Sequence, residues 1–226
     1  VMSGHELMDA EPYIRISGAG AIHWPDTWAV KDPGSLVTAY ADLFSKLGGR
    51  IVRGDARSLS TAGSGWSVRT AEGPIEAEAV VVALGPWSPA LLKPFGYEIQ
   101  MVRKRGYHMH YRCETPPMDE ANGYVLAPML KGMRITTGAE LTRKASLAPP
   151  VQLRRAYRAA TEIIPLGSPV ENAPWSGTRP CMPDMLPVIG EAPKYTGLWF
   201  HFGHGHQGFT LGPATGRILA ELMTGE

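Results

Sequence analysis

The sequence predicts an α/β fold of mixed α+β character, in which two regions differ in strand pattern. Residues 33–47 carry apolar side chains at helical spacing and lead into a short apolar segment, which is the helix-to-strand order of a doubly wound sheet. Residues 79–84 are all apolar and rich in valine, as is typical of a strand buried on both faces of a parallel sheet. Residues 97–142 alternate polar and apolar positions, which favours an antiparallel sheet in the second region.

The first long helix is predicted to begin after Asp32, because an aspartate cap followed by Pro33 is typical of a helix N-terminus. It is predicted to end at the glycine pair 48–49. A short strand is expected before it at residues 21–24, and another after it at residues 50–53. Its buried stripe is expected to consist of Leu36, Val37, Tyr40, Leu43, Phe44 and Leu47.

Residues 57–77 contain three alternating segments separated by glycine turns, which predicts a three-stranded meander. The buried strand at residues 79–84 then ends in a turn that starts with Gly85 and Pro86. This turn lies at the carboxyl end of its strand, where open α/β sheets bind ligands. The order of helix, strand, meander, buried strand and glycine turn is typical of the middle and end of a dinucleotide-binding domain.

Three strands of the antiparallel sheet are expected at residues 101–111, 124–128 and 133–137. An amphipathic helix is expected at residues 151–164, where Pro165 ends the pattern. The last helix is expected to start near Gly212 and Pro213 and to bury Ile218, Leu219 and Leu222.

The segment 175–210 holds the densest set of candidate functional residues. Arg179 lies between turn-forming residues, an arrangement that presents a fixed cation. An apolar strand at residues 198–202 leads into the glycine-rich residues 203–208 and then the last helix. Such a join places backbone amides and a helix dipole against a ligand oxygen or phosphate, although many α/β domains contain it without a ligand.

Composition excludes several classes of protein. The chain is 44% hydrophobic with a net charge of +1, which argues against nucleic acid or an anionic membrane as a partner. It has no apolar run of about 18 residues, so no transmembrane segment is expected. The two cysteines, Cys113 and Cys181, favour a reducing compartment, so we expect a cytoplasmic protein and leave peripheral membrane association open. His108 and His110 share a strand face without further ligands at suitable spacing, so no metal site is predicted.

Several short motifs occur in an order that resembles the FAD-dependent amino acid oxidase and dehydrogenase family, which includes D-amino acid dehydrogenases, glycine oxidases and sarcosine oxidases. The resemblance extends from about residue 21 to the end, and the ordered set is specific although each motif alone is weak. The motifs are Gly48-Gly49, residues 80–88, Arg105-Gly106-Tyr107, residues 175–180, Pro183-Asp184, residues 187–190 and residues 203–208.

The resemblance implies hydride transfer from the α-carbon of an amino acid to FAD, which oxidises the C–N bond. The amino acid would be a D-amino acid or, as in sarcosine and glycine oxidases, an N-substituted glycine or glycine. Oxygen or a quinone would accept the electrons. The resemblance further implies an FAD-binding domain at residues 28–90 and 180–226, and an antiparallel-sheet substrate domain at residues 1–27 and 91–179.

Family members open with a strand and a Gly-x-Gly-x-x-Gly turn that binds the FAD pyrophosphate, and this sequence lacks that turn. We therefore expect a carboxyl-terminal portion of such an enzyme, which would be inactive and colourless when isolated. The alternative is a non-catalytic fragment or subunit that needs a partner chain to bind FAD.

The resemblance implies three catalytic candidates. Arg179 would bind the substrate carboxylate with its planar guanidinium, and the alternative is a structural ion pair with Asp184. His206 would face the substrate or else lie in solvent. Tyr124 would supply a pocket hydroxyl or else pack in the core.

The resemblance also implies cofactor contacts, made mostly by main chain. Cys181 is out of register with the position at which some relatives attach flavin, so we expect non-covalent FAD. The expected cofactor-binding residues are Arg57, Ala83, Leu84, Gly85, Trp87, Gly205, His206, Gln207, Gly208, Phe209 and Thr210.

Overall fold

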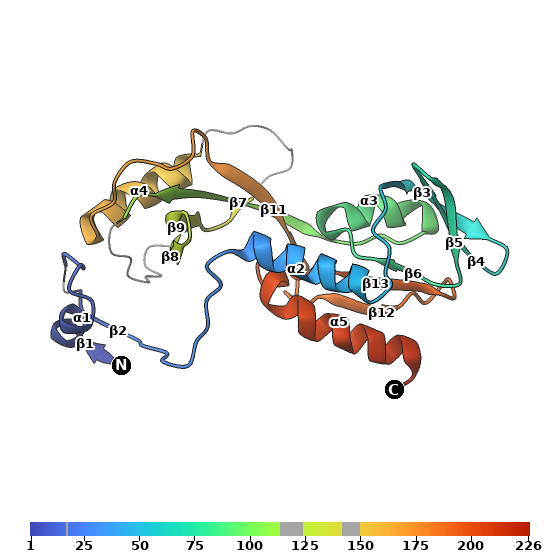
Figure 1. Ribbon diagram of the computed structural model, residues 1–226, viewed down its shortest axis with the longest axis horizontal. Coiled ribbons are helices and arrows are strands. Elements are labelled where there is room, and N and C mark those ends of the chain that lie inside the picture. The colour runs from blue at the N-terminus through green and yellow to red at the C-terminus, as the bar shows by residue number, and fades with distance from the viewer. Residues whose placement is uncertain (17, 114–123, 142–149) are drawn as a thin grey trace. The chain divides into compact units, whose positions relative to one another are not determined.

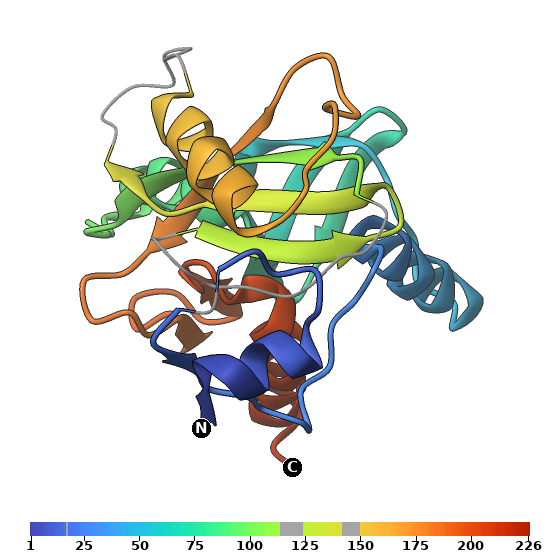
Figure 2. The same ribbon diagram turned by 90° about the vertical axis from the view of Figure 1, so that its left-hand side faces the viewer.

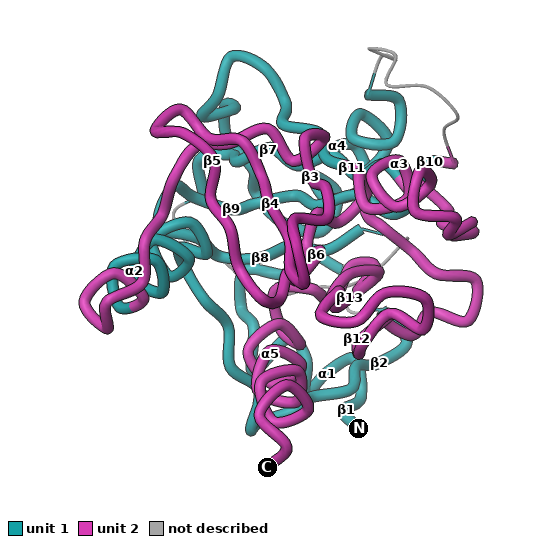
Figure 3. The backbone as a smooth tube through the Cα atoms, turned by 90° about the vertical axis from the view of Figure 1, so that its right-hand side faces the viewer, with its two compact units in different colours: residues 1–43, 105–140, 144–177 teal, residues 44–104, 141–143, 178–226 magenta. Residues whose placement is uncertain are grey.

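The computed structural model describes residues 1–16, 18–113, 124–141 and 150–226. The chain forms two compact units, which Figure 3 shows in different colours. Unit 1 contains residues 1–43, 105–140 and 144–177, and unit 2 contains residues 44–104, 141–143 and 178–226. The divisions therefore fall after residues 43, 104 and 177, whereas the sequence predicts them after residues 27, 90 and 179.

An antiparallel sheet lies in the second half of the sequence, as predicted. Its strand order is β10-β7-β9-β8, and β11 also pairs with β7. The three strands that the sequence predicts are confirmed as β7, β8 and β9. The bounds are β7 (Val102–Tyr111), β8 (Tyr124–Met129), β9 (Gly132–Thr137), β10 (Glu140–Leu141) and β11 (Trp175–Cys181).

One face of this sheet is covered by α4 (Val151–Ile163), which confirms the predicted amphipathic helix (Figure 2). Successive strand residues point to opposite faces, so the residues that pack on α4 alternate with His108, His110 and Arg134 on the other face. Tyr157 of α4 stacks on Tyr111 with ring centroids 4.7 Å apart. The buried core on the α4 side includes Tyr107, Tyr111, Tyr124, Leu126, Met133, Ile135, Leu153, Ala156, Ala160 and Ile163.

The N-terminal elements of unit 1 are short: β1 (Met2–Ser3), α1 (Gly4–Ala10) and β2 (Gly20–Ala21). Ser3 caps α1 reciprocally with Glu6, whose carboxylate accepts a 2.7 Å hydrogen bond from the Ser3 backbone N–H. The strand predicted at residues 21–24 is shorter and is shifted toward the N-terminus. It pairs antiparallel with β1.

The helix predicted after Asp32 is confirmed as α2 (Pro33–Lys46). Asp32 Oδ1 accepts a 3.2 Å hydrogen bond from the Ser35 N–H, and Gly48 has a φ of +92° beyond the last turn. The prediction that its apolar stripe is buried is wrong, because no residue of α2 is buried in the described chain. The residues exposed by about half or more are Val37, Tyr40, Leu43, Phe44 and Leu47.

The meander is confirmed as the three-stranded antiparallel sheet β3 (Gly54–Ala62), β4 (Gly65–Thr70) and β5 (Gly73–Ala77). The strand predicted at residues 50–53 is wrong, because the ladder with β4 begins only at Gly54. A single backbone bond, from the Ala71 N–H to the Arg53 carbonyl oxygen, precedes it.

The second sheet of unit 2 has the order β12-β13-β6, with β12 (Val188–Glu191), β13 (Leu198–Phe202) and β6 (Val80–Val82). β6 runs parallel to β13, as a doubly wound sheet requires. The predicted burial on both faces is wrong for Val81, which is 37% exposed, whereas Val82 is 2% exposed. The difference arises because β6 is the edge strand of the described sheet. Three short helical segments follow, η1 (Gly85–Trp87), α3 (Ser88–Leu92) and η2 (Lys93–Phe95).

The last helix, α5 (Gly208–Thr224), packs against β12 and β13 (Figure 1). The predicted start near Pro213 is wrong by more than one turn. A proline at this point removes only one backbone donor near the helix start, so the helix continues through it. Of the predicted buried stripe, Leu219 is buried, while Ile218 and Leu222 are 44% and 54% exposed.

Candidate cofactor and substrate site

The glycine turn after β6 begins at Gly85, whose φ of +52° lies in the left-handed region that favours glycine. Ala83 and Leu84 connect the strand to this turn, and the Trp87 N–H closes it on the Leu84 carbonyl oxygen at 3.1 Å. The Trp87 side chain is 70% exposed. A Cβ on Gly85 would lie 3.9 Å from Pro180 Cγ, so the turn contacts the residue that follows Arg179.

The second glycine segment, which we call the glycine loop (residues 203–207), is attached to the same strand. The Gly205 N–H donates a 2.8 Å hydrogen bond to the Pro180 carbonyl oxygen, and His204 forms a β-bridge with Cys181. Gly203 has a φ of +88°, and a Cβ there would lie 2.7 Å from Met182 Cγ. Only glycine therefore fits at Gly203 without rearrangement.

The N-terminus of α5 follows the glycine loop directly. The cap residue Gln207 makes no side-chain capping bond, and the first turn contains no acidic residue. Gly208, Phe209 and Thr210, expected in the loop, form the first turn of the helix instead. Their amides and the positive end of the helix dipole therefore suit a ligand oxygen.

Arg179 lies within β11 and not in a turn, which corrects the sequence interpretation. Its side chain is half-buried. Asp184, its predicted partner in the ion-pair alternative, accepts a 3.0 Å hydrogen bond from the Leu186 N–H. Because Pro180 contacts both the Gly85 turn and the glycine loop, unit 2 brings Arg179 next to both candidate cofactor segments.

The remaining cofactor-side candidates are exposed. His206 and Gln207 lie at the surface, and Phe209 is 45% exposed. Arg57 lies on β3, where its Nε binds Asp55 Oδ1 at 3.0 Å. Hydrogen bonds from Arg57 hold the pKa of the Asp55 carboxyl below its usual range, so this is a local surface pair. None of the printed contacts of Arg57 reaches the glycine segments in the described chain.

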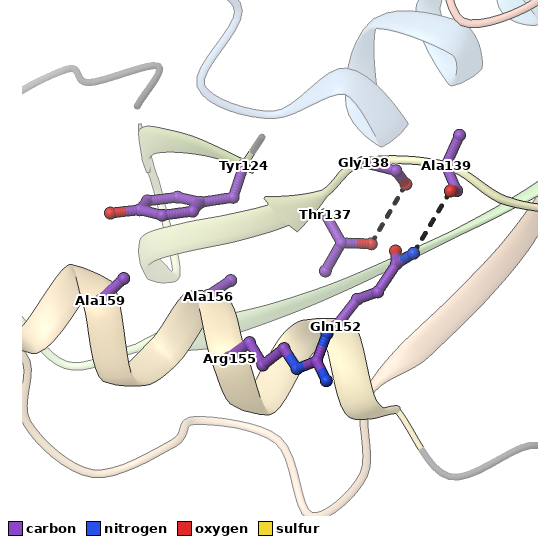
Figure 4. Close-up of a pocket in the computed structure, with 8 residues that line it drawn as sticks. All are labelled: Tyr124, Thr137, Gly138, Ala139, Gln152, Arg155, Ala156 and Ala159. Atoms are coloured by element: carbon purple, nitrogen blue, oxygen red, sulfur yellow. Dashed lines mark hydrogen bonds between the residues drawn. The ribbon is translucent and has the colours of Figure 1, made fainter. Parts of the chain in front are cut away.

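Tyr124 points toward α4 and is 3% exposed (Figure 4). It shares its strand face with Leu126, so its position supports core packing. It also lines a cavity of about 500 Å³ in unit 1, in which Gln152 Nε2 donates a 3.2 Å hydrogen bond to the Ala139 carbonyl oxygen. The residues that line this cavity are Tyr124, Thr137, Gly138, Ala139, Gln152, Arg155, Ala156 and Ala159.

His108 and His110 lie on the sheet face opposite α4. Glu171 binds His110 twice, with Oε1 2.6 Å from Nδ1 and Oε2 accepting from the backbone N–H at 2.9 Å. His108 stacks on Trp175 at 4.7 Å, and burial, aided by the positive charge of Arg134, lowers its pKa to about 4. The described residues contain no group of three metal-ligating side chains.

Sequence reasoning missed a polar cluster formed by His201, His204 and Thr215 behind the glycine loop. Its members come from a strand, a loop and a helix, so no spacing pattern points to it. The proximity of two histidines within four positions was the only available signal.

Comparison with known families identifies the fold as a whole. A family model described as DAO, FAD dependent oxidoreductase, matches residues 1–222. The chain belongs to this family. The resemblance and the mixed fold class predicted from the sequence are thereby confirmed.

Two curated members of the family illustrate its chemistry. The chain is 37% identical over 164 residues to glycine oxidase from Pseudomonas aeruginosa, which covers 70% of this chain and 45% of the relative. It is 34% identical over 168 residues to D-amino acid dehydrogenase from Cereibacter sphaeroides, which covers 70% of this chain and 38% of the relative. The chain thus spans less than half the length of these relatives.

A solved structure of the family has the same fold. Glycine oxidase from Geobacillus kaustophilus matches 100% of this chain and 62% of its own chain, with a TM-score of 0.85 and 27% identity. None of the helices in the described residues is long and apolar enough to span a bilayer.

Proposed function

We propose that the whole protein is an FAD-dependent oxidoreductase that oxidises the C–N bond of a D-amino acid, with glycine or an N-substituted glycine as the alternative substrate. The observation that carries this proposal is the meeting of two glycine segments at Pro180, next to Arg179. The names of the relatives, glycine oxidase and D-amino acid dehydrogenase, support the substrate class.

The residues around Pro180 fit a flavin. Positive φ angles at Gly85 and Gly205 bring backbone rather than side chains to the site surface, and the start of α5 presents unpaired amides suited to negative charge. FAD, when bound, accepts the hydride. Gly205, Gln207 and the first turn of α5 would position it by main-chain contacts. Cys181 is 1% exposed, in keeping with non-covalent binding.

Arg179 would orient the substrate. A guanidinium offers two parallel N–H groups to a carboxylate, which fix the direction as well as the position of the α-carbon. Orientation of this kind contributes to the rate because the reacting atoms must be held near their transition-state geometry. His206, exposed in the glycine loop, is the further side chain that we place toward the substrate. Tyr124 remains a candidate for packing more than for contact with substrate.

The electron acceptor would be oxygen or a quinone, because one relative is named an oxidase and the other a dehydrogenase. We propose a cytoplasmic location. Measuring reoxidation of the reduced full-length protein by air and by a soluble quinone would separate the two acceptors.

The experiment that tests the Arg179 role compares full-length wild type with Arg179→Lys and Arg179→Gln. Lysine keeps the charge but loses the fork, so the efficiency of flavin reduction should fall by about 2 to 4 kcal/mol, or roughly 30-fold to 1000-fold. Arg57→Lys is the matched control, because Arg57 is an exposed arginine paired with Asp55. Unchanged reduction kinetics with a lowered melting temperature would instead assign Arg179 to a structural ion pair.

A further inference from the structure

A polar cluster lies behind the glycine loop, within unit 2. Thr215 Oγ1 of α5 is 3.0 Å from His201 Nε2 of β13 and 3.1 Å from His204 Nε2 of the loop. The same oxygen is 2.9 Å from the carbonyl oxygen of Leu211, one helical turn earlier. The two imidazole centroids are 4.8 Å apart, and Thr215 is 8% exposed. One hydroxyl therefore joins a strand, a loop and a helix.

The hydrogen-bond inventory fixes the protons in this cluster. A hydroxyl has one proton and two acceptor lone pairs, and the Leu211 carbonyl oxygen can only accept. At 2.9 Å the proton lies between these two oxygens. Thr215 must then accept from both imidazoles, so His201 and His204 both carry their proton on Nε2.

Both imidazoles are neutral at neutral pH. Burial lowers the pKa of His201 and of His204, and the neighbouring His201 lowers the pKa of His204 further. The group that faces both rings from α5 is the uncharged Thr215 hydroxyl. Neutral rings with fixed tautomers are suited to hold a backbone in place, because each ring makes one directed bond.

The cluster is connected to the candidate site by main chain. His204 forms a β-bridge with Cys181, and the next residue, Gly205, binds the Pro180 carbonyl oxygen. The loop is thus held by β11 through its backbone and by α5 through the His204 side chain. Removing either attachment would let the amides of the loop move relative to Arg179.

We propose that Thr215 is a positioning residue, which fixes the glycine loop through His201 and His204 and so sets the alignment of the loop amides beside Arg179. The effect on catalysis rests on the function proposed above, whereas the effect on loop geometry does not.

Imidazole nitrogen-15 NMR at neutral pH tests the geometry. The variants are Thr215→Val, which removes the hydroxyl at nearly constant shape, and Thr215→Ser, which keeps it. Thr224→Val is the matched control, because Thr224 lies on the same helix and back-bonds to the Ala220 carbonyl oxygen at 3.0 Å in an exposed position. His201→Gln and His204→Gln assign the signals.

We expect both rings to be Nε2–H tautomers in wild type, Thr215→Ser and Thr224→Val. Thr215→Val should give tautomer mixtures and shift the amide signals of Gly203 and Gly205. An Nδ1–H tautomer at either ring in the wild type would overturn the proposal, even if Thr215→Val failed to fold. Unchanged tautomers and loop amides in a folded Thr215→Val would overturn it too.

Flavin reduction in the full-length, FAD-loaded protein tests the consequence. Loss of the bonds made by the hydroxyl should lower the limiting reduction rate about tenfold in Thr215→Val, with rescue by Thr215→Ser and no change in Thr224→Val. A lowered melting temperature with an unchanged rate per bound flavin would contradict positioning. If amino acids do not reduce the wild type, the proposed function fails, and the NMR result alone decides the role of Thr215 in the loop.

Discussion

The backbone N–H of Gly205 donates a 2.8 Å hydrogen bond to the carbonyl oxygen of Pro180. This bond joins the loop before α5 to the residue that follows Arg179, and the Gly85 turn contacts the same proline. A single residue of β11 therefore brings together three segments that are far apart in the sequence. The candidate site depends on this meeting point more than on any one side chain.

The burial of β6 predicts different outcomes for two adjacent valines. Val82→Asp should unfold unit 2, because an unpaired buried carboxylate costs several kcal/mol against a total stability of about 5 to 15 kcal/mol. Val81→Asp should cost far less, because Val81 is 37% exposed and Val82 is 2% exposed. Urea unfolding of the two variants checks this expectation. Equal losses of stability would mean that the Val81 face of β6 is also buried.

The environment of His108 predicts a pH dependence of stability. Its pKa of about 4 in the folded protein lies below the ordinary value of 6.5, so the unfolded chain binds more protons between these limits. The contribution of His108 to the free energy of unfolding should therefore be constant above pH 6.5 and decline as the pH falls from 6.5 to 4. His108→Gln should flatten the decline.

The matched control for His108 is His5→Gln, because the His5 side chain is 88% exposed. Urea unfolding over a pH series should give the same acid loss for His5→Gln as for wild type. An NMR titration midpoint of His108 near its ordinary value would contradict the burial of this ring against Trp175.

The close approach of Trp175 to Gly177 predicts an effect of one methyl group. A Cβ on Gly177 would lie 2.0 Å from Trp175 Cη2, so Gly177→Ala should displace the indole and remove its stacking on His108. The lost ring contact should cost about 0.5 to 1.5 kcal/mol. The pKa of His108 should rise toward its ordinary value, as NMR titration would show.

Gly216→Ala is the control for Gly177→Ala, because a Cβ at Gly216 of α5 meets nothing within 4 Å. Alanine there should stabilise the helix by about 0.5 to 1 kcal/mol. It should leave the His108 titration unchanged. A His108 titration that is the same in Gly177→Ala as in wild type would show that the indole does not depend on Gly177.

Local patterns were sufficient for the elements whose signal is periodic. The helix α4 and the meander β3 to β5 follow directly from apolar spacing and glycine turns. The exposure of α2 and of Val81 could not be predicted, because spacing identifies the apolar face of an element without saying what covers it. The early start of α5 was missed because Pro213 was interpreted as a helix start.

The candidate site was only partly accessible from the sequence. Arg179 and the glycine segments were found by their resemblance to a family, while the meeting point at Pro180 required coordinates. Strand alternation could have placed Tyr124 on the same face as Leu126, toward α4. The Thr215 cluster left no such signal, because a threonine that back-bonds within a helix looks like any other helical threonine.

The most direct test of the proposed function is anaerobic mixing of the full-length, FAD-loaded protein with D-alanine, L-alanine, glycine and sarcosine. The proposal predicts saturable loss of the oxidised-flavin absorbance with D-alanine, or with glycine or sarcosine, and release of one ammonia for each D-alanine oxidised. A full-length protein that binds no FAD, or whose bound FAD stays oxidised with each of these amino acids, would contradict it.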